Sequence, residues 1–314
     1  MKTCFIFNPH SGRNRRRPGL APAIRAFIAA RSLDAELATT EGPGHATELA
    51  RAAVGAGAEV VVAVGGDGTM NEVAQGVVHT PAALALVPCG SGNGLALHLG
   101  LPLSPLAALT LATGAGGRIA AVDTGEADGR PFFNAMGLGL DAEVSARFNR
   151  LTRRGLPAYV RTAWRAWREV RPQPVTVTGG GRTETLDALL VAVANSDQYG
   201  NHARIAPGAR VDDGRLELVA VRGVGLFGAL ALVPGLFLGT LDHHPRVLRL
   251  SGPRFMIERA GPGTIHTDGE THAAGARVEV RVRPRSLRLV VPAASSAVAA
   301  PESRVPRRFA LLFP

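Results

Sequence analysis

The sequence predicts an α/β N-terminal domain with a parallel, Rossmann-like sheet, followed by a mostly β C-terminal domain of the β-sandwich type. Three observations lead to this prediction. Short apolar runs alternate with helical patterns up to about residue 125, hairpin signals dominate after that point, and glycine-rich loops follow several of the early apolar runs. The chain has 314 residues, of which 46% are hydrophobic, enough for two packed domains.

The first half of the chain has the pattern of a βαβ series. We expect strands at 3–7, up to residues 39 and 40, at 60–64 and at 83–87, and helices near 21–31 and 46–53 and from Asn71. Parallel strands of such a series end on one edge of the sheet, and ligands bind there. Four loops fall at that edge, and their sequences are NPHSG, TTEGPGHA, GGDGT and PCGSGN.

The second half is dominated by signals for antiparallel strands. An Asp-Gly pair at 128–129 separates two short runs, and RLELVAV and RVEVRVRP alternate apolar with polar residues. One basic, aromatic helix is expected at 158–170. We therefore expect domains at 1–125 and 126–293, and a loosely ordered tail at 294–314 that is rich in Pro, Ala and Ser.

The formal net charge of +10 suits nucleic acid, an anionic membrane or a phosphorylated substrate, and part of it can reflect the composition of the source genome. No nucleic-acid-binding module is recognisable, so we expect no nucleic-acid partner. The two cysteines, Cys4 and Cys89, argue against a disulfide framework, and the N-terminus lacks the features of a signal peptide. These observations favour a cytoplasmic protein.

An uncharged segment at 223–241 has almost the length that a bilayer-spanning helix needs. Its glycines and Pro234 weaken that interpretation, and no second span accompanies it. We expect a buried or membrane-grazing helix instead.

The GGDGT loop has the composition of an anion site. Gly65, Gly66 and Gly68 let successive backbone N–H groups approach a phosphate at the start of a helix, which Thr69 and Asn71 would cap. The Asp67 carboxylate next to such a site needs a cation between itself and the phosphate, and oxygen ligands favour Mg²⁺. The alternative is a strained turn in which Asp67 acts only as a cap.

The second glycine-rich loop repeats this design after the next strand, and together these loops resemble the catalytic domain of the diacylglycerol kinase-type lipid kinases. That family includes bacterial phospholipid kinases and sphingosine kinases, and the resemblance covers most of the chain. GGDGTMNEV is its most specific part, whereas GSGN is closer to sphingosine-type and some bacterial members. The resemblance implies ATP and Mg²⁺ as cofactors. It implies that the nucleotide is held by Asn8, Pro9, Ser11, Gly12, Thr40, Gly65, Gly66, Asp67, Gly68, Thr69, Asn71, Glu72, Gly90, Ser91, Gly92 and Asn93.

The segment TIHTDGETH matches the D-G-E of this family. By that resemblance Asp268 is the general base for the lipid hydroxyl, Glu270 assists it or reaches the metal, and Asp67 completes the catalytic group. Without the resemblance, the same segment is an acidic turn between two strands. His266 and His272 flank it, and we expect both to be solvated rather than metal-bound.

Two further segments resemble family motifs, and each keeps a simpler alternative. In NAMGLGLDAEV, Asp141 would contact a polar group of the substrate, or it would cap a helix. In IAPGARVDDGRLEL, Asp213 would bind a structural cation together with the carbonyl groups of Arg210 and Arg215, or the Asp-Gly pair would form a plain turn.

The expected activity is transfer of the γ-phosphate of ATP to a lipid hydroxyl, in a cleft between the two domains. Diacylglycerol, phosphatidylglycerol and a sphingoid base all remain as acceptors. A lipid partner would place the protein peripherally at the inner membrane surface, where helix 158–170 either contacts headgroups or is an ordinary amphipathic helix. Segment 223–241 either lines an acyl-chain pocket or is buried.

Two alternatives of other classes remain. A soluble NAD kinase- or phosphofructokinase-like enzyme would keep the GGDG loop and lack the D-G-E pairing, and a non-catalytic sensor would lack the base. The sequence leaves open whether the chain forms a homodimer.

Overall fold

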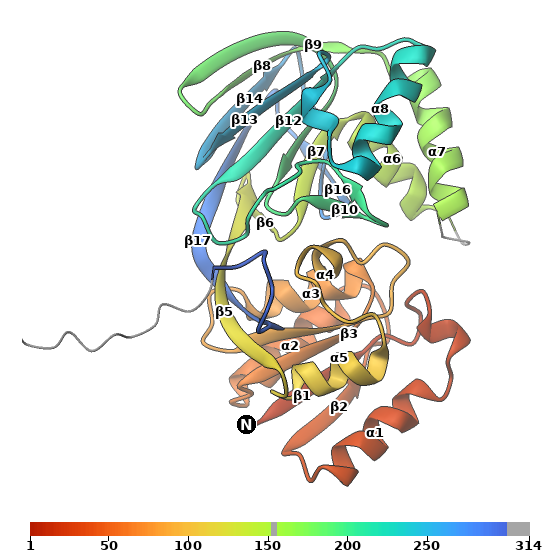
Figure 1. Cartoon of the computed structure of the whole chain (residues 1–314), viewed down its shortest axis with the longest axis vertical. Coiled ribbons are helices and arrows are strands. Elements are labelled where there is room, and N and C mark those ends of the chain that lie inside the picture. The colour runs from red at the N-terminus through yellow and green to blue at the C-terminus, as the bar shows by residue number, and fades with distance from the viewer. Residues whose placement is uncertain (152–155, 300–314) are drawn as a thin grey trace, which may run out of the picture.

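The computed structural model describes residues 1–151 and 156–299, and it has two lobes joined by two long strands (Figure 1). Strands β5 (Gly117–Ala127) and β17 (Arg277–Pro292) pair antiparallel and run from one lobe into the other. The first lobe is α/β with parallel strands, and the second is built from antiparallel strands. The predicted fold class is confirmed.

The sheet of the first lobe has the order β4-β3-β1-β2, with all strands parallel. Its strands are β1 (Thr3–Phe7), β2 (Ala35–Thr39), β3 (Val60–Gly65) and β4 (Ala83–Pro88). Strands β1, β3 and β4 are buried along their whole length, as expected of central parallel strands that are covered on both faces. The helices are η1 (Asn14–Arg16), α1 (Leu20–Ala30), α2 (His45–Gly55), α3 (Asp67–Val77), α4 (Gly94–His98) and α5 (Pro105–Ala112).

The second lobe is a sheet of antiparallel strands with a main buried cluster and a smaller one beside α8. Its strands follow the order β16-β15-β7-β9-β8-β14-β17, and β12 pairs with β9 and β13. Apolar side chains from nearly all of these strands, Phe132, Met136, Val191 and Phe255 among them, belong to a single buried cluster. The strands are β6 (Arg130–Phe132), β7 (Ala135–Gly139), β8 (Gln173–Gly179), β9 (Arg182–Ala194), β10 (Gln198–Gly200), β11 (Ala203–Arg204), β12 (Leu216–Arg222), β13 (Val247–Gly252), β14 (Arg254–Arg259), β15 (Gly263–Thr267) and β16 (Glu270–Ala274).

The remaining helices lie on one side of the second lobe (Figure 1). They are α6 (Leu140–Asn149), α7 (Leu156–Glu169), α8 (Leu226–Leu238) and the short η2 (Leu241–His243). The sequence predicted a buried or membrane-grazing helix within 223–241, and burial is wrong, because Leu232 is the one buried residue of α8. In the described part of the chain, no helix is long and apolar enough to cross a membrane.

The first lobe is completed by the end of the chain. The last part of β17 pairs in parallel with β4, and its residues Leu287, Leu289 and Val291 belong to the core of the first lobe. The expected boundary at residue 125 therefore falls inside β5, and the expected second domain (126–293) ends in residues that pack with the first.

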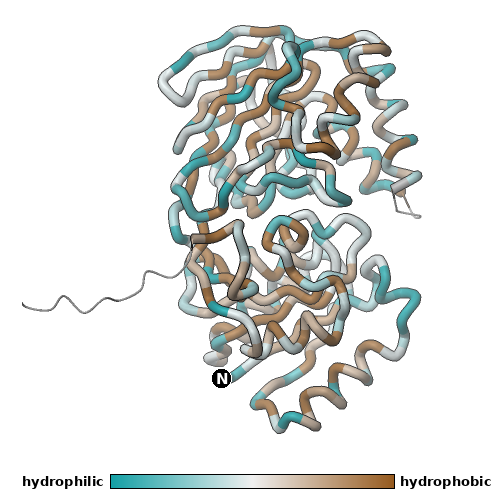
Figure 2. Tube along the Cα trace, viewed as in Figure 1, coloured by the Kyte–Doolittle hydropathy of each residue, from teal (hydrophilic) through white to brown (hydrophobic). Residues whose placement is uncertain are grey.

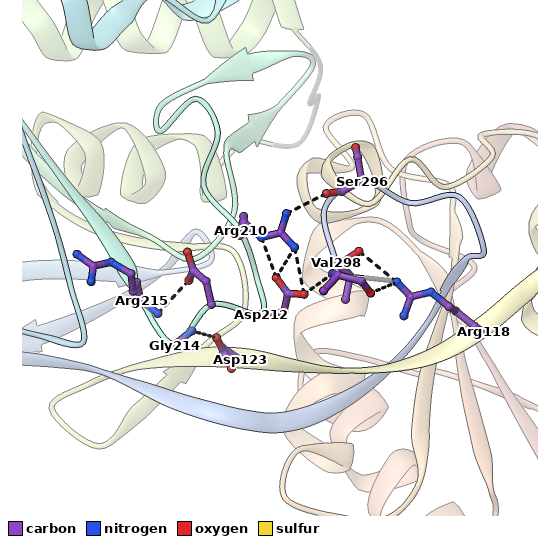
Figure 3. A network of polar contacts seen from close by, with 10 residues as sticks. Arg118, Asp123, Arg210, Asp212, Gly214, Arg215, Ser296 and Val298 are labelled. Carbon is purple, nitrogen blue, oxygen red and sulfur yellow. Dashed lines mark hydrogen bonds and ion pairs between the residues drawn. The ribbon is translucent and has the colours of Figure 1, made fainter. Parts of the chain in front are cut away.

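The segment after β17 is also packed against the first lobe (Figure 3). Ala297 and Val298 are buried in its core, and the Arg118 guanidinium donates hydrogen bonds to the carbonyl oxygens of Val298 (3.1 Å) and Ala299 (2.6 Å). The backbone N–H of Ala299 donates to the Asp212 carboxylate. The loosely ordered tail expected from residue 294 is therefore wrong up to residue 299, and the rest of it lies outside the described residues.

We expect that Val298→Asp lowers the free energy of unfolding by about 2–4 kcal/mol, because it places a carboxylate in the apolar core of the first lobe. Ala294→Asp, at an exposed position of the same segment, should change it by less than about 0.5 kcal/mol. Urea unfolding followed by circular dichroism measures both values. Equal stability of the two variants would contradict the packing of this segment.

Candidate active site

Four loops were predicted to lie at the carboxyl ends of the parallel strands, and direct hydrogen bonds join three of them. The Asn8 side-chain amide donates to the Thr69 hydroxyl at 2.9 Å, which joins the loop after β1 to the loop after β3. The N–H of Cys89 donates to the Gly65 carbonyl oxygen at 2.7 Å, and the N–H of Arg13 donates to the Cys89 carbonyl oxygen at 2.8 Å. These bonds place the loops after β1, β3 and β4 side by side.

Glycine is required where these loops touch. A Cβ atom on Gly66 would lie 2.9 Å from the Cα of Gly90, and one on Gly12 would lie 2.8 Å from the carbonyl oxygen of Cys89. Gly68 differs, because a Cβ atom there would meet nothing within 4 Å. Packing therefore does not explain Gly68, which leaves open space at the start of α3.

The start of α3 offers free backbone donors. The helix begins at Asp67, its N-cap is Gly66, and no side chain caps it. The N–H of Met70 is the first to bond within the helix, to the Gly66 carbonyl oxygen, so the preceding N–H groups have no partner inside it. The expectation that Thr69 and Asn71 cap this helix is wrong, because it starts before both. Such a helix start attracts anions.

The Asp67 carboxylate points to the second glycine-rich loop. One oxygen accepts a hydrogen bond from the N–H of Asn93 (2.8 Å), and the other accepts one from the N–H of Gly94 (2.7 Å), at the start of α4. Burial raises the pKa of Asp67, and these two amides oppose that shift. Asp67 thus joins two of the loops, and its part in Mg²⁺ binding and catalysis stays a prediction. Within the described ranges, no three His, Cys, Asp or Glu side chains are grouped as metal ligands.

The second lobe covers the second glycine-rich loop. The N–H of Asn201 donates to the Gly92 carbonyl oxygen at 3.1 Å, and a Cβ atom on Gly200 would lie 3.0 Å from the Cα of Gly92. On α4, the Nδ1 atom of His98 lies 2.7 Å from the carboxylate of Asp197. The two lobes are therefore in direct contact beside the predicted nucleotide site.

The D-G-E turn joins β15 to β16, and backbone amides hold its first residue. One oxygen of Asp268 accepts a hydrogen bond from the N–H of Phe133 (2.7 Å), and the other accepts from the N–H groups of Asn134 (2.8 Å) and Ala135 (3.0 Å). Burial raises the pKa of Asp268 to about 6, although these three amides act in the opposite direction. Asp268 is therefore ionised at pH 7 and basic enough to accept a proton at neutral pH.

Glu270 lies where the second lobe faces α3. Burial raises its pKa, the nearby carboxylates of Glu72 and Asp268 raise it further, and the Asn71 side chain lowers it. Asn71 is 1% exposed, and its Nδ2 atom has no well-aligned hydrogen-bond partner among the described residues. The structure thus brings the predicted residues Asn71 and Glu72 of the first lobe next to Glu270 and Asp268 of the second.

Asp141 forms a buried polar group with two residues of distant segments. Its Oδ2 atom lies 3.0 Å from Nε2 of His266 and accepts a hydrogen bond from the Tyr199 hydroxyl at 2.7 Å. Burial raises the pKa of Asp141, but His266 and Tyr199 outweigh it and the pKa is lowered. Burial lowers the pKa of His266, but Asp141 outweighs it and the pKa is raised. The Nδ1 atom of His266 accepts from the N–H of Gly269 at 3.2 Å, so this group supports the D-G-E turn.

Two expectations change here. His266 is buried and paired, so the expectation that it is solvated is wrong. Asp141 lies in the first turn of α6, but the N-cap of that helix is Gly139 and no side chain caps it. The cap alternative therefore does not hold, and contact of Asp141 with a substrate stays a prediction.

Tyr199 and the positive charge near the loops were not predicted. The one available signal concerned Asp141: Gly137 of NAMGLG is a glycine because a Cβ atom there would collide with the Asp141 carboxylate, to which Tyr199 donates. Burial raises the pKa of Cys89 to about 11, and Arg17 and Arg13 lie near enough to oppose that shift. These two arginines therefore place positive charge beside the glycine-rich loops.

The Asp213 loop lies beside β5, in the network of Figure 3. The Asp213 carboxylate accepts a hydrogen bond from the N–H of Arg215 at 3.0 Å. Burial raises the pKa of Asp213, and the nearby carboxylates of Asp123 and Glu217 also raise it. The Arg210 guanidinium pairs with the neighbouring Asp212 at 3.0 Å. A cation held by Asp213 and the carbonyl groups of Arg210 and Arg215 stays a prediction.

Comparisons with known proteins agree with this geometry. Residues 2–127 match the diacylglycerol kinase catalytic domain, and residues 134–291 match the YegS C-terminal NAD kinase beta sandwich-like domain. A "Probable lipid kinase YegS-like" of Pseudomonas putida is 32% identical over 262 residues, which cover 82% of this chain and 85% of the relative. The diacylglycerol kinase of Bacillus subtilis is 26% identical over 274 residues, 85% of this chain and 88% of the relative.

A solved structure of a diacylglycerol kinase from Bacillus anthracis str. Sterne has the same fold. It superposes with a TM-score of 0.67 at 20% identity, and the match covers 95% of this chain and 98% of that one. The two lobes described above are therefore an arrangement that occurs in a solved protein.

We expect that Tyr199→Phe lowers the free energy of unfolding by about 1.5–3 kcal/mol, because the buried Asp141 carboxylate loses a hydrogen bond from a side chain. Tyr159 is the matched control: it lies near Asp141, but among the described residues Asp141 accepts no hydrogen bond from it. Tyr159→Phe should change the stability by less than about 0.5 kcal/mol. Urea unfolding at pH 7 measures the free energy of unfolding of both variants. Similar decreases in the two would contradict the assigned role of Tyr199.

Proposed function

Because the chain belongs to the diacylglycerol kinase-type lipid kinase family, we propose that it transfers the γ-phosphate of ATP to a hydroxyl group of a lipid. One observation carries the proposal: Glu270 of the D-G-E turn lies beside Asn71 and Glu72 of α3, the helix of the other lobe whose start is uncapped. The acceptor is of the diacylglycerol, phosphatidylglycerol or sphingoid type. The Bacillus subtilis relative, which is named a diacylglycerol kinase, supports the first of these.

The first lobe supplies the nucleotide site. The N–H groups at the start of α3 would bind phosphate oxygens, and the open space over Gly68 admits them. Arg13 and Arg17 add positive charge at the edge of the loops, which favours a triphosphate. In phosphoryl transfer most of the catalysis is such positioning and charge stabilisation.

The residues present also fit a magnesium ion. Each Asp67 oxygen accepts one amide hydrogen bond and so retains a free lone pair. Burial raises the pKa of Glu270, repulsion from Glu72 and Asp268 raises it further, and a bound cation would relieve that repulsion. Asp67 and Glu270 each offer oxygen donors that would suit Mg²⁺, which would neutralise phosphate charge when bound.

The second lobe supplies the base. Asp268 takes the proton as the acceptor O–H bond breaks, the acceptor oxygen bonds to the γ-phosphorus, and the bond from that phosphorus to the β-phosphate oxygen breaks to release ADP. The Asp268 oxygen that accepts only the Phe133 amide keeps a lone pair for this proton. His266 holds the turn through Gly269 and acts as a positioning residue.

The test is ATP consumption against a panel of lipids in mixed micelles. Asp268→Asn should lower kcat by about 10²–10⁴-fold with at least one lipid, because the amide cannot accept the proton. Its affinity for ATP should stay close to that of the parent, since the nucleotide loops belong to the other lobe. Phosphorylation at the parent's rate by Asp268→Asn would refute the base, and activity on soluble acceptors alone would refute the lipid kinase.

We expect opposite effects of Gly68→Ala on folding and on nucleotide binding. The new methyl group meets nothing within 4 Å, so stability should be unchanged or rise by up to about 1 kcal/mol. The methyl group occupies the space left for phosphate, so ATP affinity should fall by about tenfold or more. Calorimetry measures both quantities.

The matched control is Gly19→Ala, at the N-cap of α1, where a Cβ atom also meets nothing within 4 Å. It should leave ATP affinity as it is. If Gly68→Ala binds ATP as tightly as this control, the phosphates do not lie at the start of α3.

The pH dependence of kcat/KM should report Asp268. The pKa of Asp268 is raised to about 6 and the active form is the carboxylate, so the rate should be constant above that pH and fall about tenfold per pH unit below it. The folded state binds this proton more tightly than the unfolded chain does, so the stabilisation from protonated Asp268 is lost as the pH rises to about 6. A profile of kcat/KM from pH 4.5 to 8 measures the fall below pH 6. A profile that is flat down to about pH 4.5 would be inconsistent with this base.

A further inference from the structure

Helix α8 exposes an apolar face that no part of the described chain covers. Phe227 is 86% exposed and Leu238 is 73% exposed, and the helix carries no charged residue (Figure 2). We define the α8 apolar face by its exposed large side chains, Leu226, Phe227, Leu230, Val233, Phe237 and Leu238. Contiguous exposed apolar surface of this kind marks an interaction site in a water-soluble lobe.

The face is a stripe along one side of the helix. At about 100° per residue, its six side chains fall within an arc of about 140°, and Leu232, the one buried residue, lies on the opposite side. In an ordinary surface helix, an apolar stripe of this width is turned to the core. Here the helix contacts the lobe through the side that carries Leu232, and the apolar stripe faces solvent.

The segment before α8 contacts the end of a basic and aromatic helix, α7. Gly223, just before α8, packs on Pro172, just after α7, where an added Cβ atom would lie 2.5 Å from the proline ring. Helix α7 exposes Arg161, Arg165 and Arg168. Its exposed Trp164 stacks on Trp167 with ring centroids 5.2 Å apart. Arginine beside tryptophan is the combination that suits anionic headgroups at a membrane interface.

Two acidic groups of these helices and their flanks are paired within the protein. Glu169 of α7 pairs with Arg147 at 2.7 Å, and Asp242 after α8 pairs with Arg249 at 3.1 Å. The arginines on the exposed side of α7 have no such pairing among the ion pairs of the described residues. The α7 arginines therefore add net positive charge near the start of α8, where Asp187 is an exposed carboxylate residue whose backbone carbonyl accepts a hydrogen bond from the N–H of Gly223.

We propose that α8 docks on an anionic lipid bilayer, with its apolar face among the acyl chains and the α7 arginines at the headgroups. The helix has 13 residues, or about 20 Å, which is too short to span a bilayer and sufficient to lie in its interface. This inference rests on the proposed function for its purpose, because docking gives the enzyme access to lipid acceptors. Helix α6, which carries Asp141, packs against α7 and against β15 and β16, the strands of the D-G-E turn, so the α7 arginines lie one helix away from that turn.

A second copy of the chain fits this face less well. A symmetric dimer puts the same patch of each copy together, so the α7 arginines of both copies would approach one another. An anionic bilayer instead attracts these arginines and accepts an apolar stripe without requiring complementary side chains. Charge thus favours the bilayer.

Vesicle flotation tests the docking. The parent should float with vesicles of phosphatidylcholine that contain about 30% phosphatidylserine, and much less with phosphatidylcholine alone. The double variant Phe227→Ser, Leu238→Ser should bind the anionic vesicles at least about tenfold more weakly, because it removes the two most exposed side chains of the face. Leu106→Ser in the first lobe, at a position that is 64% exposed, is the matched control and should float like the parent.

The remaining outcomes separate docking from activity. With a short-chain acceptor dissolved as a monomer, the double variant should phosphorylate at the parent's rate, because the cleft is intact. If the parent floats and phosphorylates no lipid, docking stands and the proposed function fails. Flotation of the double variant like the parent overturns the docking. The docking is also overturned if the parent does not float, forms a dimer in sedimentation equilibrium, and loses that dimer in the double variant. That result would assign the face to self-association.

Discussion

Carboxylates that accept hydrogen bonds from backbone amides of distant segments hold this molecule in its working shape. Asp67 binds the amides of Asn93 and Gly94 and joins the loops after β3 and β4. Asp268 binds the amides at 133–135, and Asp123 binds those of Gly214 and Arg285. Hydrogen bonds to an ionised acceptor are stronger than neutral ones, so a few carboxylates can fix loops that share little apolar contact.

The same constraint sets the basicity of the carboxylate at the D-G-E turn. Burial without hydrogen-bond donors would raise the pKa of a carboxyl group until it is protonated at neutral pH. Many donors would lower the pKa so far that the carboxylate is a poor base. Asp268 lies between these limits, because burial outweighs its three amide bonds and leaves a pKa of about 6. The paired group of Asp141, His266 and Tyr199 lies behind the turn and keeps it in place. The residue proposed as the base is thus also one that joins segments of the second lobe.

Local patterns predicted the parts of the fold that depend on local chemistry. Apolar runs ending in glycine gave the parallel strands and the loops that meet at their ends, and Asp128–Gly129 gave a hairpin turn in which both residues have positive φ. The pairing of His266 with Asp141 could not be predicted, because it joins residues far apart in the chain and depends on the sheet that brings β15 beside β7. The packing of residues 297 and 298 was missed because small apolar residues do not distinguish a tail from a core segment.

Helix α8 shows why composition alone does not determine the environment of a helix. An uncharged apolar sequence fits a protein core, a bilayer or its interface equally well, and only the surrounding fold separates these cases. Here apolar clusters lie on both faces of β9, one with Val191 and Val193 and one with Ala192 and Ala194, and α8 contributes only Leu232 and Leu236 to the second. The helix is left on the outside, where water is a poor solvent for it. A helix kept apolar at such a position is consistent with a partner that is itself apolar.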